Sequence, residues 1–522
     1  MAWNIADLIE HAVDAVPDRV AIICGDREET YAQLDDRANR LAHHLAASGV
    51  RPGEHVGVYG FNSLEFVETI LAAYKMRAVP INVNYRYVEA ELRYLFDNAD
   101  LVALVHDEQF TPRIAAVRDS LPLLKHLLPI GPEYEAALAA AAPGRDFGPR
   151  SDDDIYILYT GGTTGMPKGV VWRQEDVLRV LGGGIDFNTG EKIEDEYRFS
   201  KAAAESDEGK TIIIAPLMHG AAQWGMINGL ANGRSIVLMP KFDAHEVWKA
   251  VEKHRITSLN VTGDAMARPL IEALDEAHYD VSSLASVAST AAVFSGAVKE
   301  RFLDRFPNLV IAEAVGSTET GYNGATIIVK GQELKPGLPT VRMGPDTVVF
   351  DDDYNIVQPG SGVVGKMARG GNVPLRYHKD PEKSAATFVT VGGKRWAVSG
   401  DLALVEPDGS LTLLGRGSVC INSGGEKIFP EEVEAALKAH PGVFDAVVVG
   451  VPDERWGERV AAVVQPRDGK HLTLEDIDRH CREHVAGYKV PRELHLVEAI
   501  ERSPSGKPDY PWAKKVATGG IS

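Results

Sequence analysis

A loop rich in glycine and threonine, Thr160-Gly161-Gly162-Thr163-Thr164-Gly165-Met166-Pro167-Lys168-Gly169, carries the residue types that bind phosphates. Its glycines allow backbone N–H groups to approach a ligand closely and to take φ values that other residues avoid. The threonine hydroxyls and the ammonium group of Lys168 add further donors and a positive charge. Clustered donors and a cation are the groups that a polyphosphate requires. The loop therefore predicts a phosphate-binding site.

Apolar segments flank this loop on both sides. Residues 155–158 are typical of a buried strand, and Val170-Val171-Trp172 is also strand-like. The loop therefore joins two strands, whereas a Walker A motif places Gly-Lys-Ser/Thr directly before a helix. Met166 and Pro167 separate Gly165 from Lys168, which excludes that motif. The alternative is a solvated surface hairpin, which the flanking strands make less favourable.

Residues 160–169 resemble the phosphate loop of the adenylate-forming superfamily, which includes acyl-CoA synthetases, luciferases and the adenylation domains of peptide synthetases. Further motifs follow in the order of that superfamily, so the resemblance covers essentially the whole chain. Glu313-Ala314-Val315-Gly316-Ser317-Thr318-Glu319 resembles its Tyr-Gly-x-Thr-Glu motif, and Ser399-Gly400-Asp401 resembles its Thr-Gly-Asp motif. Residues 502–507 resemble its lysine loop near the C-terminus.

The resemblance implies a role for each matched residue of the first two motifs. The ATP phosphates and base would lie against Thr160, Gly161, Gly162, Thr163, Thr164, Lys168, Glu313, Gly316 and Thr318. Thr318 would contact the α-phosphate, and Glu319 would bind Mg²⁺, for which a carboxylate is a suitable hard ligand. Glu313 would accept a hydrogen bond from the adenine amino group. Val315 replaces the aromatic residue that stacks on adenine, so either ATP binds more weakly or another side chain stacks.

Asp401, Arg416 and Lys507 complete the implied ATP site. Asp401 would accept hydrogen bonds from both ribose hydroxyls, because the paired oxygens of a carboxylate suit a vicinal diol. Arg416 would bridge ribose and phosphate. A lysine in a loop of Gly, Pro and Ser is normally solvated, but the resemblance places Lys507 between the substrate carboxylate and the α-phosphate, where negative charge develops. We expect the catalytic residues to be Lys507, Glu319 and Thr163.

Three residues are expected on the acyl and CoA side of the site. His219 follows a strand and a proline, as a histidine does in synthetases of this superfamily, although a lone histidine is more often structural. Trp224 either lines the acyl channel or belongs to the core. Gly425 would lie against the pantetheine arm, where only glycine leaves room. Residues 182–184, three glycines, either form a plain loop or let a ligand approach the backbone.

The resemblance implies two half-reactions. A carboxylate attacks the α-phosphorus of MgATP, which gives an acyl-adenylate and pyrophosphate; the C-terminal domain then rotates, and the thiol of CoA attacks the acyl carbon. Ser418-Val419 stands where the superfamily commonly has Lys-Asp, so the residue at the pivot is left open. The chain has no Gly-x-Ser-x-Gly motif, which agrees with a reaction that needs no covalent nucleophile.

The substrate and two alternative functions depend on weaker signals. Residues 172–176, 182–184 and 420–425 resemble actinobacterial fatty-acyl-CoA synthetases, including enzymes that act on sterol side chains, which implies a long or bulky acyl chain. One alternative is an acyl-AMP ligase that loads a separate carrier protein, since no Leu-Gly-Gly-x-Ser carrier site is present. The other is a nucleotide-binding regulator without catalytic activity. The missing Walker sequence disfavours a kinase.

The elements that must position these residues alternate between short apolar strands and longer helical segments, for example a helix over 31–47 and a strand over 258–261. Such alternation predicts parallel βαβ units. Short strands separated by Asp, Gly and Pro turns follow from about 341 to 414. We therefore expect an α/β fold. A large N-terminal domain (1–415) would hold two βαβ-type subdomains and a small β subdomain, and a small, mobile α+β C-terminal domain (416–522) would follow.

Composition limits the partners and the compartment. The 522 residues suggest about three units. A net charge of −19 argues against nucleic acid or an anionic membrane as a main partner. Three scattered cysteines suit a reducing compartment, so we expect a cytoplasmic protein. The chain has no secretory signal pattern and no apolar run near the roughly 20 residues of a membrane span. A homodimer is left open as its assembly state.

Overall fold

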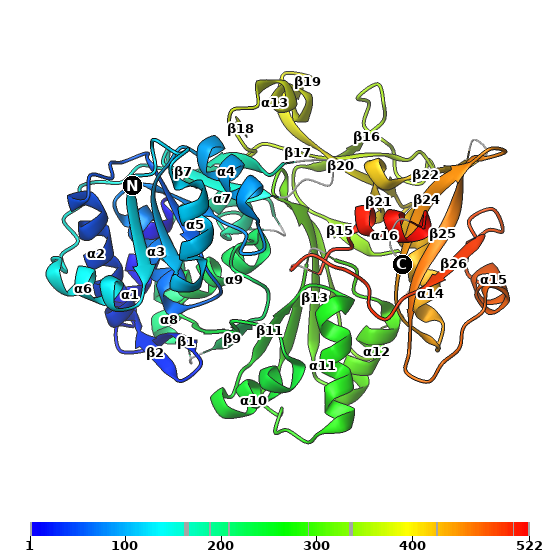
Figure 1. The fold of residues 1–522 in the computed structure, drawn as a ribbon, viewed down its shortest axis with the longest axis horizontal. Helices are drawn as coiled ribbons and strands as arrows, with labels where there is room; N and C mark the ends of the chain where they lie inside the picture. Colours follow the sequence, from blue (N-terminus) through cyan, green and yellow to red (C-terminus); the bar gives the residue numbers. More distant parts are fainter. Residues whose placement is uncertain are drawn as a thin grey trace.

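The structure is a computed structural model, and it describes residues 3–160, 166–186, 189–206, 209–290, 292–332, 338–423, 426–504 and 506–519. A large N-terminal lobe and a small C-terminal lobe are joined by one crossing of the chain (Figure 1). This arrangement confirms the predicted α/β class and its large-plus-small organisation. None of the described helices is long and apolar enough to cross a membrane.

The first part of the N-terminal lobe is built around a parallel four-stranded sheet with the order β4-β3-β5-β6. The hydroxyl of Thr30 accepts from the backbone N–H of Gln33, whose side chain accepts from the Thr30 N–H, so a capping box starts helix α2 where the sequence predicts it. The elements are α1 (Ile5–Ala15), β1 (Val20–Cys24), β2 (Arg27–Thr30), α2 (Tyr31–Ala47), β3 (His55–Tyr59), α3 (Leu64–Lys75), β4 (Val79–Asn82), α4 (Glu89–Asn98), β5 (Leu101–Asp107), η1 (Glu108–Phe110), α5 (Thr111–Arg118), β6 (His126–Ile130) and α6 (Pro132–Ala140).

A larger central sheet follows, with the order β16-β17-β20-β21-β15-β14-β13-β12-β11-β9-β10-β1-β2. It is parallel from β10 to β13 and antiparallel from β13 through β21. The added elements are β7 (Ile155–Thr160), β8 (Lys168–Arg173), α7 (Gln174–Leu181), α8 (Arg198–Glu205), β9 (Lys210–Ile213), α9 (Gly220–Ala231), β10 (Ser235–Leu238), α10 (Ala244–His254), β11 (Ser258–Val261), α11 (Asp264–Glu276), β12 (Ser286–Ser289), α12 (Gly296–Arg305), β13 (Val310–Ser317) and β14 (Gly321–Ile328).

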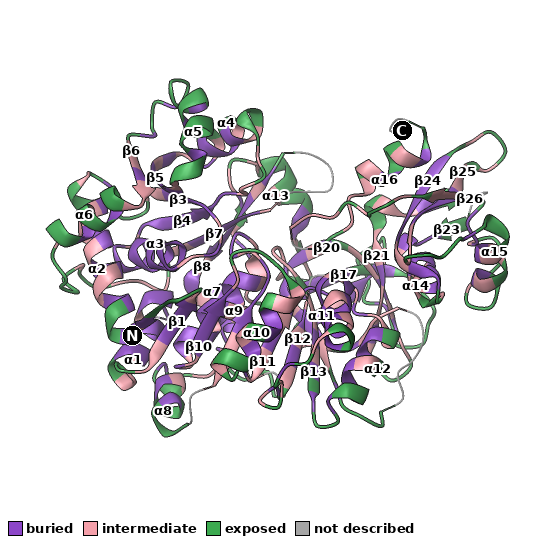
Figure 2. Cartoon of the chain, turned by 60° about the horizontal axis from the view of Figure 1, so that its bottom comes forward, coloured by how far each residue is buried: buried purple, intermediate pink, exposed green. Residues whose placement is uncertain are grey.

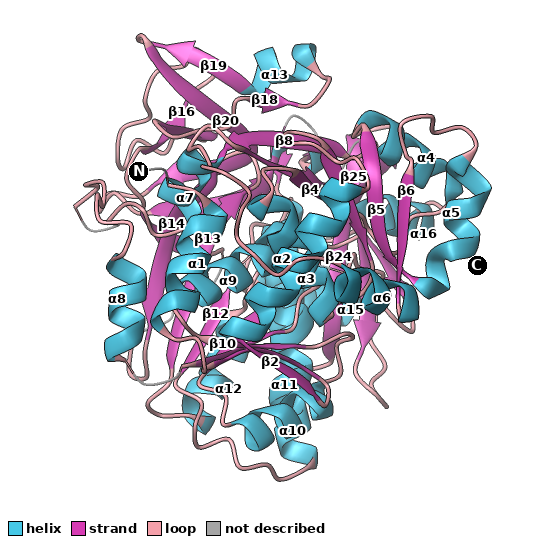
Figure 3. Cartoon of the chain, turned by 90° about the vertical axis from the view of Figure 1, so that its left-hand side faces the viewer, coloured by secondary structure: helices cyan, strands magenta, loops and turns pink. Residues whose placement is uncertain are grey.

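Helices α1, α2, α3 and α9 lie between the four-stranded sheet and the central sheet (Figure 3). Their apolar faces and the central strands form the largest hydrophobic core, and most of these strands are buried (Figure 2). In this arrangement the helices cover the faces of the two sheets, and the loops at the ends of the strands stay uncovered. Ligand sites of α/β proteins lie at such ends.

The β-rich region after residue 340 is hydrogen-bonded into the central sheet, because β15 pairs with both β14 and β21. The predicted β subdomain is therefore an extension of the same ladder and does not form a separate sheet. Its elements are β15 (Thr340–Met343), β16 (Thr347–Phe350), β17 (Gly365–Gly370), β18 (Arg376–Tyr377), α13 (Pro381–Thr387), β19 (Phe388–Val391), β20 (Lys394–Val405), β21 (Leu411–Arg416) and η2 (Gly417–Val419). Strand β18 leaves this ladder and pairs with β8 beside the phosphate loop.

The C-terminal lobe is a five-stranded sheet with helices packed against it, and it has a hydrophobic core of its own. Its elements are β22 (Ile421–Ser423), β23 (Glu426–Ile428), α14 (Pro430–Ala439), β24 (Val443–Asp453), β25 (Gly457–Pro466), α15 (Leu474–Arg482), β26 (Glu493–Leu496) and α16 (Tyr510–Ala517). The predicted domain boundary at residues 415–416 coincides with the end of β21, and it stays a prediction.

Candidate active site

Residues 502–504 and 506–507 belong to a segment of the C-terminal lobe that protein contacts hold in place. Nε and Nη2 of Arg502 donate to the two carboxylate oxygens of Asp445 at 2.7 Å each, and its Nη1 donates to the carbonyl of Gly506 at 2.8 Å. Burial acts to raise the pKa of Asp445, but Lys438 and Arg502 lower it to about 2. The carboxylate therefore stays ionised at physiological pH and keeps its hold on Arg502.

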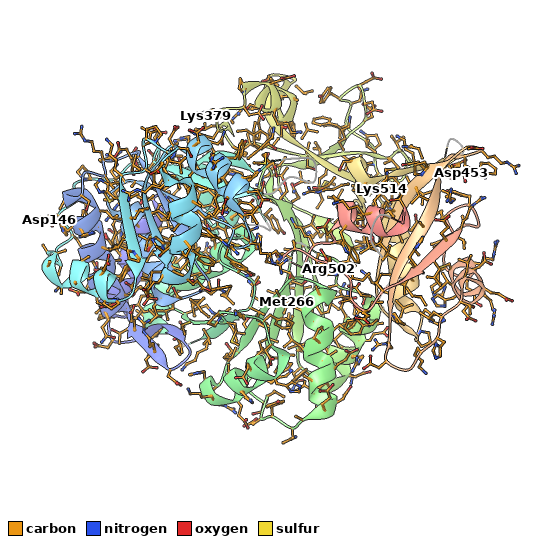
Figure 4. All side chains as sticks on the ribbon, in the orientation of Figure 1. Asp146, Met266, Lys379, Asp453, Arg502 and Lys514 are labelled. Atoms are coloured by element: carbon orange, nitrogen blue, oxygen red, sulfur yellow. The ribbon has the colours of Figure 1, made fainter. Side chains whose placement is uncertain are left out.

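This loop rests on the N-terminal lobe at the start of α11. A Cβ atom built on Gly506 would lie 2.9 Å from Cβ of Ala265 and 3.1 Å from Oγ1 of Thr262. Gly506 also has a φ of +76°, a backbone conformation that favours glycine. Figure 4 shows Arg502 of the loop beside Met266 of α11. The fit between the two lobes therefore depends on a glycine at position 506.

Two polar contacts accompany this packing. Nη1 of Arg86 donates to the carbonyl oxygen of Arg502 at 3.0 Å, and Nη1 of Arg467 lies 2.7 Å from Oε1 of Glu272. The Arg467–Glu272 contact is a partly exposed ion pair, and such pairs contribute about 0–1 kcal/mol. These contacts therefore determine the relative orientation of the two lobes, and they add little to the free energy that holds the lobes together. We call this arrangement, with Gly506 packed against the start of α11, the docked position.

In the docked position Lys507 extends toward charged residues of the N-terminal lobe. Its enclosure lowers the pKa of the ammonium group, and the nearby Arg416 lowers it further, whereas Asp401 and Glu319 act to raise it. By its accessible surface Lys507 is exposed, so protein atoms surround the ammonium group without covering the side chain. The structure thus brings together four predicted site residues that come from four separate segments of the sequence.

Asp401 and Arg416 face each other across neighbouring strands. They are paired in the antiparallel register of β20 and β21, and Nε of Arg416 lies 3.3 Å from Oδ1 of Asp401. The backbone N–H of Asp401 donates to Oγ of Ser399 at 3.2 Å. A carboxylate and a guanidinium group side by side can bind a hydroxyl-bearing group and an adjacent anion together.

Thr318 and Glu319 lie in the turn between β13 and β14. Nε1 of Trp172 donates to the carbonyl of Thr318 at 3.0 Å, and the hydroxyl of Tyr377 donates to Oε1 of Glu319 at 2.9 Å. Burial, followed by the charge of Glu319, raises the pKa of Tyr377, which keeps its hydroxyl protonated. The bond orients the carboxylate, and the second oxygen of a carboxylate retains lone pairs for a cation.

Gly316 is required by the backbone of the same hairpin. A Cβ atom on this residue would lie 2.0 Å from the carbonyl oxygen of Gly321 on the opposite strand. No side chain fits there, so the structure gives a packing reason for a glycine that the sequence placed in the ATP site. Its predicted contact with the nucleotide stays a prediction.

The described ends of the phosphate loop are Thr160 and Lys168, which are paired across β7 and β8 as the two-strand prediction requires. Nζ of Lys168 contacts the carboxylate of Asp380, which also caps helix α13 by accepting from the N–H of Lys383 at 2.9 Å. A carboxylate therefore holds the lysine that was predicted to bind phosphate. Residues 161–165, with the predicted Gly161, Gly162, Thr163 and Thr164, lie outside the described residues.

Glu313 lies at the edge of a cavity and has a cationic partner. Nζ of Lys299 donates to its Oε2, and both side chains are buried. The cavity has a volume of about 600 Å³, and Lys299, Glu313, Phe294 and Met343 are among its lining residues. Val315 is half-buried and packs against the small core around Val341. Lys299 is an addition to the predicted site, because it can orient the Glu313 carboxylate.

His219 and Trp224 start helix α9 but differ in their surroundings. Burial, followed by the charges of Lys507 and Arg86, lowers the pKa of His219 to about 3, so its imidazole is neutral at physiological pH. Its Nε2 is buried and has no hydrogen-bond partner among the described residues. Trp224 belongs to the main core, with its ring 5.5 Å from that of Tyr156. His219 therefore lies in the Lys507 neighbourhood, and an additional channel role for Trp224 stays a prediction.

The structure tests the ligand-binding interpretation for one of the two remaining groups of glycines, residues 182–184, and does not describe the other, Gly425. A Cβ atom built on Gly182 would meet Leu178, and one on Gly183 would meet Phe199, each at 3.2 Å or less. A Cβ atom built on Gly184 would meet both Arg179 and Trp3 within the same distance. Close approach of other protein segments thus explains this run without a ligand. Gly425, predicted beside the pantetheine arm, lies outside the described residues.

Five side chains around the site were not identified from the sequence: Tyr377, Asp380, Arg86, Thr262 and Lys299. Each acts through a partner distant in the chain, and none belongs to a motif that we singled out. Arg86 in particular shows that the first 150 residues, which hold none of the matched motifs, also contribute a charge to the site. The only local signal was the pairing of charged and aromatic residues in 376–380, which by itself indicates no chemistry.

Comparisons with known proteins agree with this geometry. The family model for AMP-binding enzymes matches residues 9–376, and that for the AMP-binding enzyme C-terminal domain matches residues 432–507. The chain is 54% identical over 532 residues to 3-oxocholest-4-en-26-oate–CoA ligase from Rhodococcus rhodochrous, covering 98% of this chain and 96% of that protein. It is 54% identical over 528 residues to the medium/long-chain-fatty-acid–CoA/3-oxocholest-4-en-26-oate–CoA ligase of Mycobacterium tuberculosis, covering 99% and 96%.

A solved structure shows the same fold. The anthranilate CoA ligase AuaEII in complex with anthranoyl-AMP superposes with a TM-score of 0.87 at 24% identity, covering 99% of this chain and 98% of that one. The fold, the residues gathered around Lys507 and the full-length relatives confirm the resemblance drawn from the motifs. The chain belongs to the AMP-binding enzyme family and, within it, to the acyl-CoA synthetases, the acid–thiol ligases that use ATP and CoA.

Proposed function

We propose that this synthetase activates a bulky carboxylate, a sterol side-chain acid, along with medium- and long-chain fatty acids, and transfers the acyl group to CoA. The substrate class follows from the names of two relatives that are 54% identical over nearly the full chain. The observation that carries the mechanism is the position of Lys507, held beside Asp401, Arg416 and Glu319 by the docked loop.

In the proposed first half-reaction the substrate carboxylate attacks the α-phosphorus of ATP and pyrophosphate leaves. Lys507 lies between the two anions and stabilises the charge that develops between them. Asp401 accepts hydrogen bonds from the ribose hydroxyls, and Arg416 bridges ribose and phosphate. Lys168 leaves its ion pair with Asp380 and binds the β- and γ-phosphates. The same phosphates are surrounded by Thr160, Gly161, Gly162, Thr163 and Thr164. Enclosure by both lobes strengthens each of these interactions, since it reduces screening by water.

Glu319 is the proposed protein ligand of Mg²⁺. Its oriented carboxylate fits a hard cation, which commonly takes only one or two protein carboxylates and completes its shell with phosphates and water. When bound, the ion neutralises charge on the phosphates. Glu313, oriented by Lys299, accepts a hydrogen bond from the adenine amino group at the rim of the cavity, and Gly316 and Thr318 lie along the nucleotide.

In the proposed second half-reaction the C-terminal lobe turns at residues 416–420, the docked loop leaves α11, and the CoA thiol attacks the acyl carbon. AMP is the leaving group. His219 stays neutral because of its low pKa, and its Nε2 has no partner in the described part of the chain, so it can serve the adenylate or the incoming thioester as a hydrogen-bonding group without adding charge. Gly425 would then face the pantetheine arm.

A substrate panel tests the proposal. The purified protein is given ATP, Mg²⁺ and CoA with a sterol side-chain acid, medium-chain and long-chain fatty acids, or acetate, and AMP and acyl-CoA are measured. We expect the highest kcat/KM with the sterol acid or the longer fatty acids. A strong preference for acetate would refute the substrate assignment. Higher turnover with an acyl carrier protein than with free CoA would favour the carrier-loading alternative.

Assembly and location complete the proposal. A homodimer in the cytoplasm is consistent with the acidic composition and the sparse cysteines. Size-exclusion chromatography with light scattering measures the mass in solution. A monomer at all concentrations would remove the dimer from the proposal and leave the reaction unaffected.

A further inference from the structure

Helix α15 of the C-terminal lobe ends at Arg482, and His480, Cys481, Glu483 and His484, whose side chains can bind metals, lie at this end or directly after it. A tight turn follows the helix, in which the N–H groups of Glu483 and His484 donate to the carbonyls of His480 and Cys481, three residues earlier, at 3.1 and 3.0 Å. One ligand atom from each of His480, Glu483 and His484 lies within 4.8 Å of the other two.

A hydrogen bond orients the first histidine for metal binding. Nε2 of His480 lies 2.9 Å from the carbonyl oxygen of Ala436 on α14. A carbonyl only accepts, so this nitrogen carries the proton and Nδ1 keeps its lone pair. Proteins commonly orient metal-binding imidazoles through such a bond from the other ring nitrogen to a carbonyl or carboxylate. The ring of His484 lies 4.4 Å from that of His480.

A third histidine beside this group is not available as a ligand. The ring of His440 lies 4.9 Å from that of His480, but its Nδ1 accepts a hydrogen bond from the N–H of Gly442 at 3.0 Å. Its Nε2 therefore carries the proton in the neutral ring. His440 is a near neighbour of the same chemical type and serves as a matched control.

We propose that His480, Glu483 and His484 bind a divalent transition-metal ion, of which Zn²⁺ is the representative, on the surface of the C-terminal lobe. Two imidazoles and one carboxylate favour such an ion over Mg²⁺, which prefers oxygen ligands. Bond lengths of about 2.0–2.1 Å need ligand atoms about 3.3 Å apart, a distance that rotations of the two exposed side chains, Glu483 and His484, supply. Both are exposed, so we assign the site no hydrolytic role.

The bound ion would connect the end of α15 to α14 through His480 and Ala436. Helix α14 packs on β24 and contacts β21, which is the last strand of the N-terminal lobe. Figure 1 shows α15 on the far side of the C-terminal lobe from α11, so the site is separate from the residues around Lys507. The proposed Mg²⁺ ligand Glu319 plays no part in it.

Equilibrium dialysis of the full-length, tag-free protein with Zn²⁺ in excess Mg²⁺ tests the site, and Co²⁺ absorption reports the ligands. We expect one equivalent to bind saturably, and we expect His484→Gln, His480→Gln and Glu483→Gln each to weaken binding at least about tenfold. Binding should persist in His440→Gln and in His245→Gln, which alters a histidine on α10. Far-UV circular dichroism confirms that each variant is folded.

Two results would overturn the proposal. One is that no equivalent of Zn²⁺ binds saturably, or that the bound equivalent persists in all three variants. The other is an equal loss of binding in His440→Gln, which would assign the ion to a different set of nitrogens. Neither result would affect the ligase function, because acyl-CoA formation is measured separately.

Discussion

Replacing Gly506 with alanine should slow adenylate formation selectively, because the new Cβ atom collides with the N-terminal lobe only in the docked position. That atom would lie 2.9 Å from Cβ of Ala265 and 3.1 Å from Oγ1 of Thr262. Overpacking of this kind costs about 1–3 kcal/mol, which corresponds to a factor of roughly 5–150. We therefore expect the rate of the first half-reaction to fall by that factor.

The positive φ of Gly506 adds strain that is independent of docking, so the experiment needs a control for it. Gly469 lies in the same lobe with a φ of +68°, and a Cβ atom built there meets nothing within 4 Å. Gly469→Ala introduces the backbone strain, about 1–2 kcal/mol, without the collision. The difference between the two variants isolates the contact between the lobes.

The assay separates the half-reactions. Fatty-acid-dependent exchange of pyrophosphate into ATP reports adenylation, and transfer from preformed acyl-AMP to CoA reports the second step. Gly506→Ala should reduce the exchange and leave the transfer nearly unchanged, and adding Ala265→Gly should restore part of the exchange. Equal loss of both half-reactions, or equal loss of exchange in Gly469→Ala, would show that the docked position is not the adenylating one.

Four further predictions concern the charges of the site. Lys507→Ala should reduce pyrophosphate exchange at least about a hundredfold while acyl-AMP still reacts with CoA; parallel losses would contradict the proposed role. Because enclosure and Arg416 lower the pKa of Lys507 in the free enzyme, kcat/KM for the exchange should decline on the alkaline side at a pH below 10.5, the ordinary value, and the transfer step should lack this limb. Glu319→Gln should raise the Mg²⁺ concentration for half-maximal exchange by about tenfold or more, and an unchanged Mg²⁺ titration would exclude this ligand. Asp380→Asn keeps the α13 cap but frees Lys168, so the KM for ATP should fall up to about fivefold; a higher KM would mean that Asp380 helps to bind ATP.

Local sequence signals predicted the fold well where one segment decides its own structure. The helix over 31–47 and the strand over 258–261 have the predicted bounds. Capping residues and hydrophobic periodicity are local, so they are readable from one segment. The continuity of the β-rich region with the central sheet was not predictable in this way, because it depends on the pairing of β15 with β14 and β21.

The active site likewise contains residues that the sequence predicted and residues that only the structure revealed. Motif order identified Lys507, Asp401, Arg416 and Glu319, and the structure brings their charges together. Their partners were missed. Tyr377 reaches Glu319 only because β18 leaves the main ladder to pair with β8, and no composition or spacing in residues 376–380 indicates that excursion. The residues that orient a site are chosen by tertiary contact, which single-sequence patterns do not encode.

The charges around Lys507 give a physical reason for the order of the two half-reactions. In the docked position burial is the main cause that lowers the pKa of Lys507, and the nearby Arg416 lowers it further, whereas Asp401 and Glu319 act to raise it. ATP and a carboxylate bring several negative charges to this point, so their binding favours docking. Departure of pyrophosphate removes most of that charge and leaves the two cations beside one phosphate. The repulsion then opposes the docked position at the moment when the C-terminal lobe must turn to admit CoA.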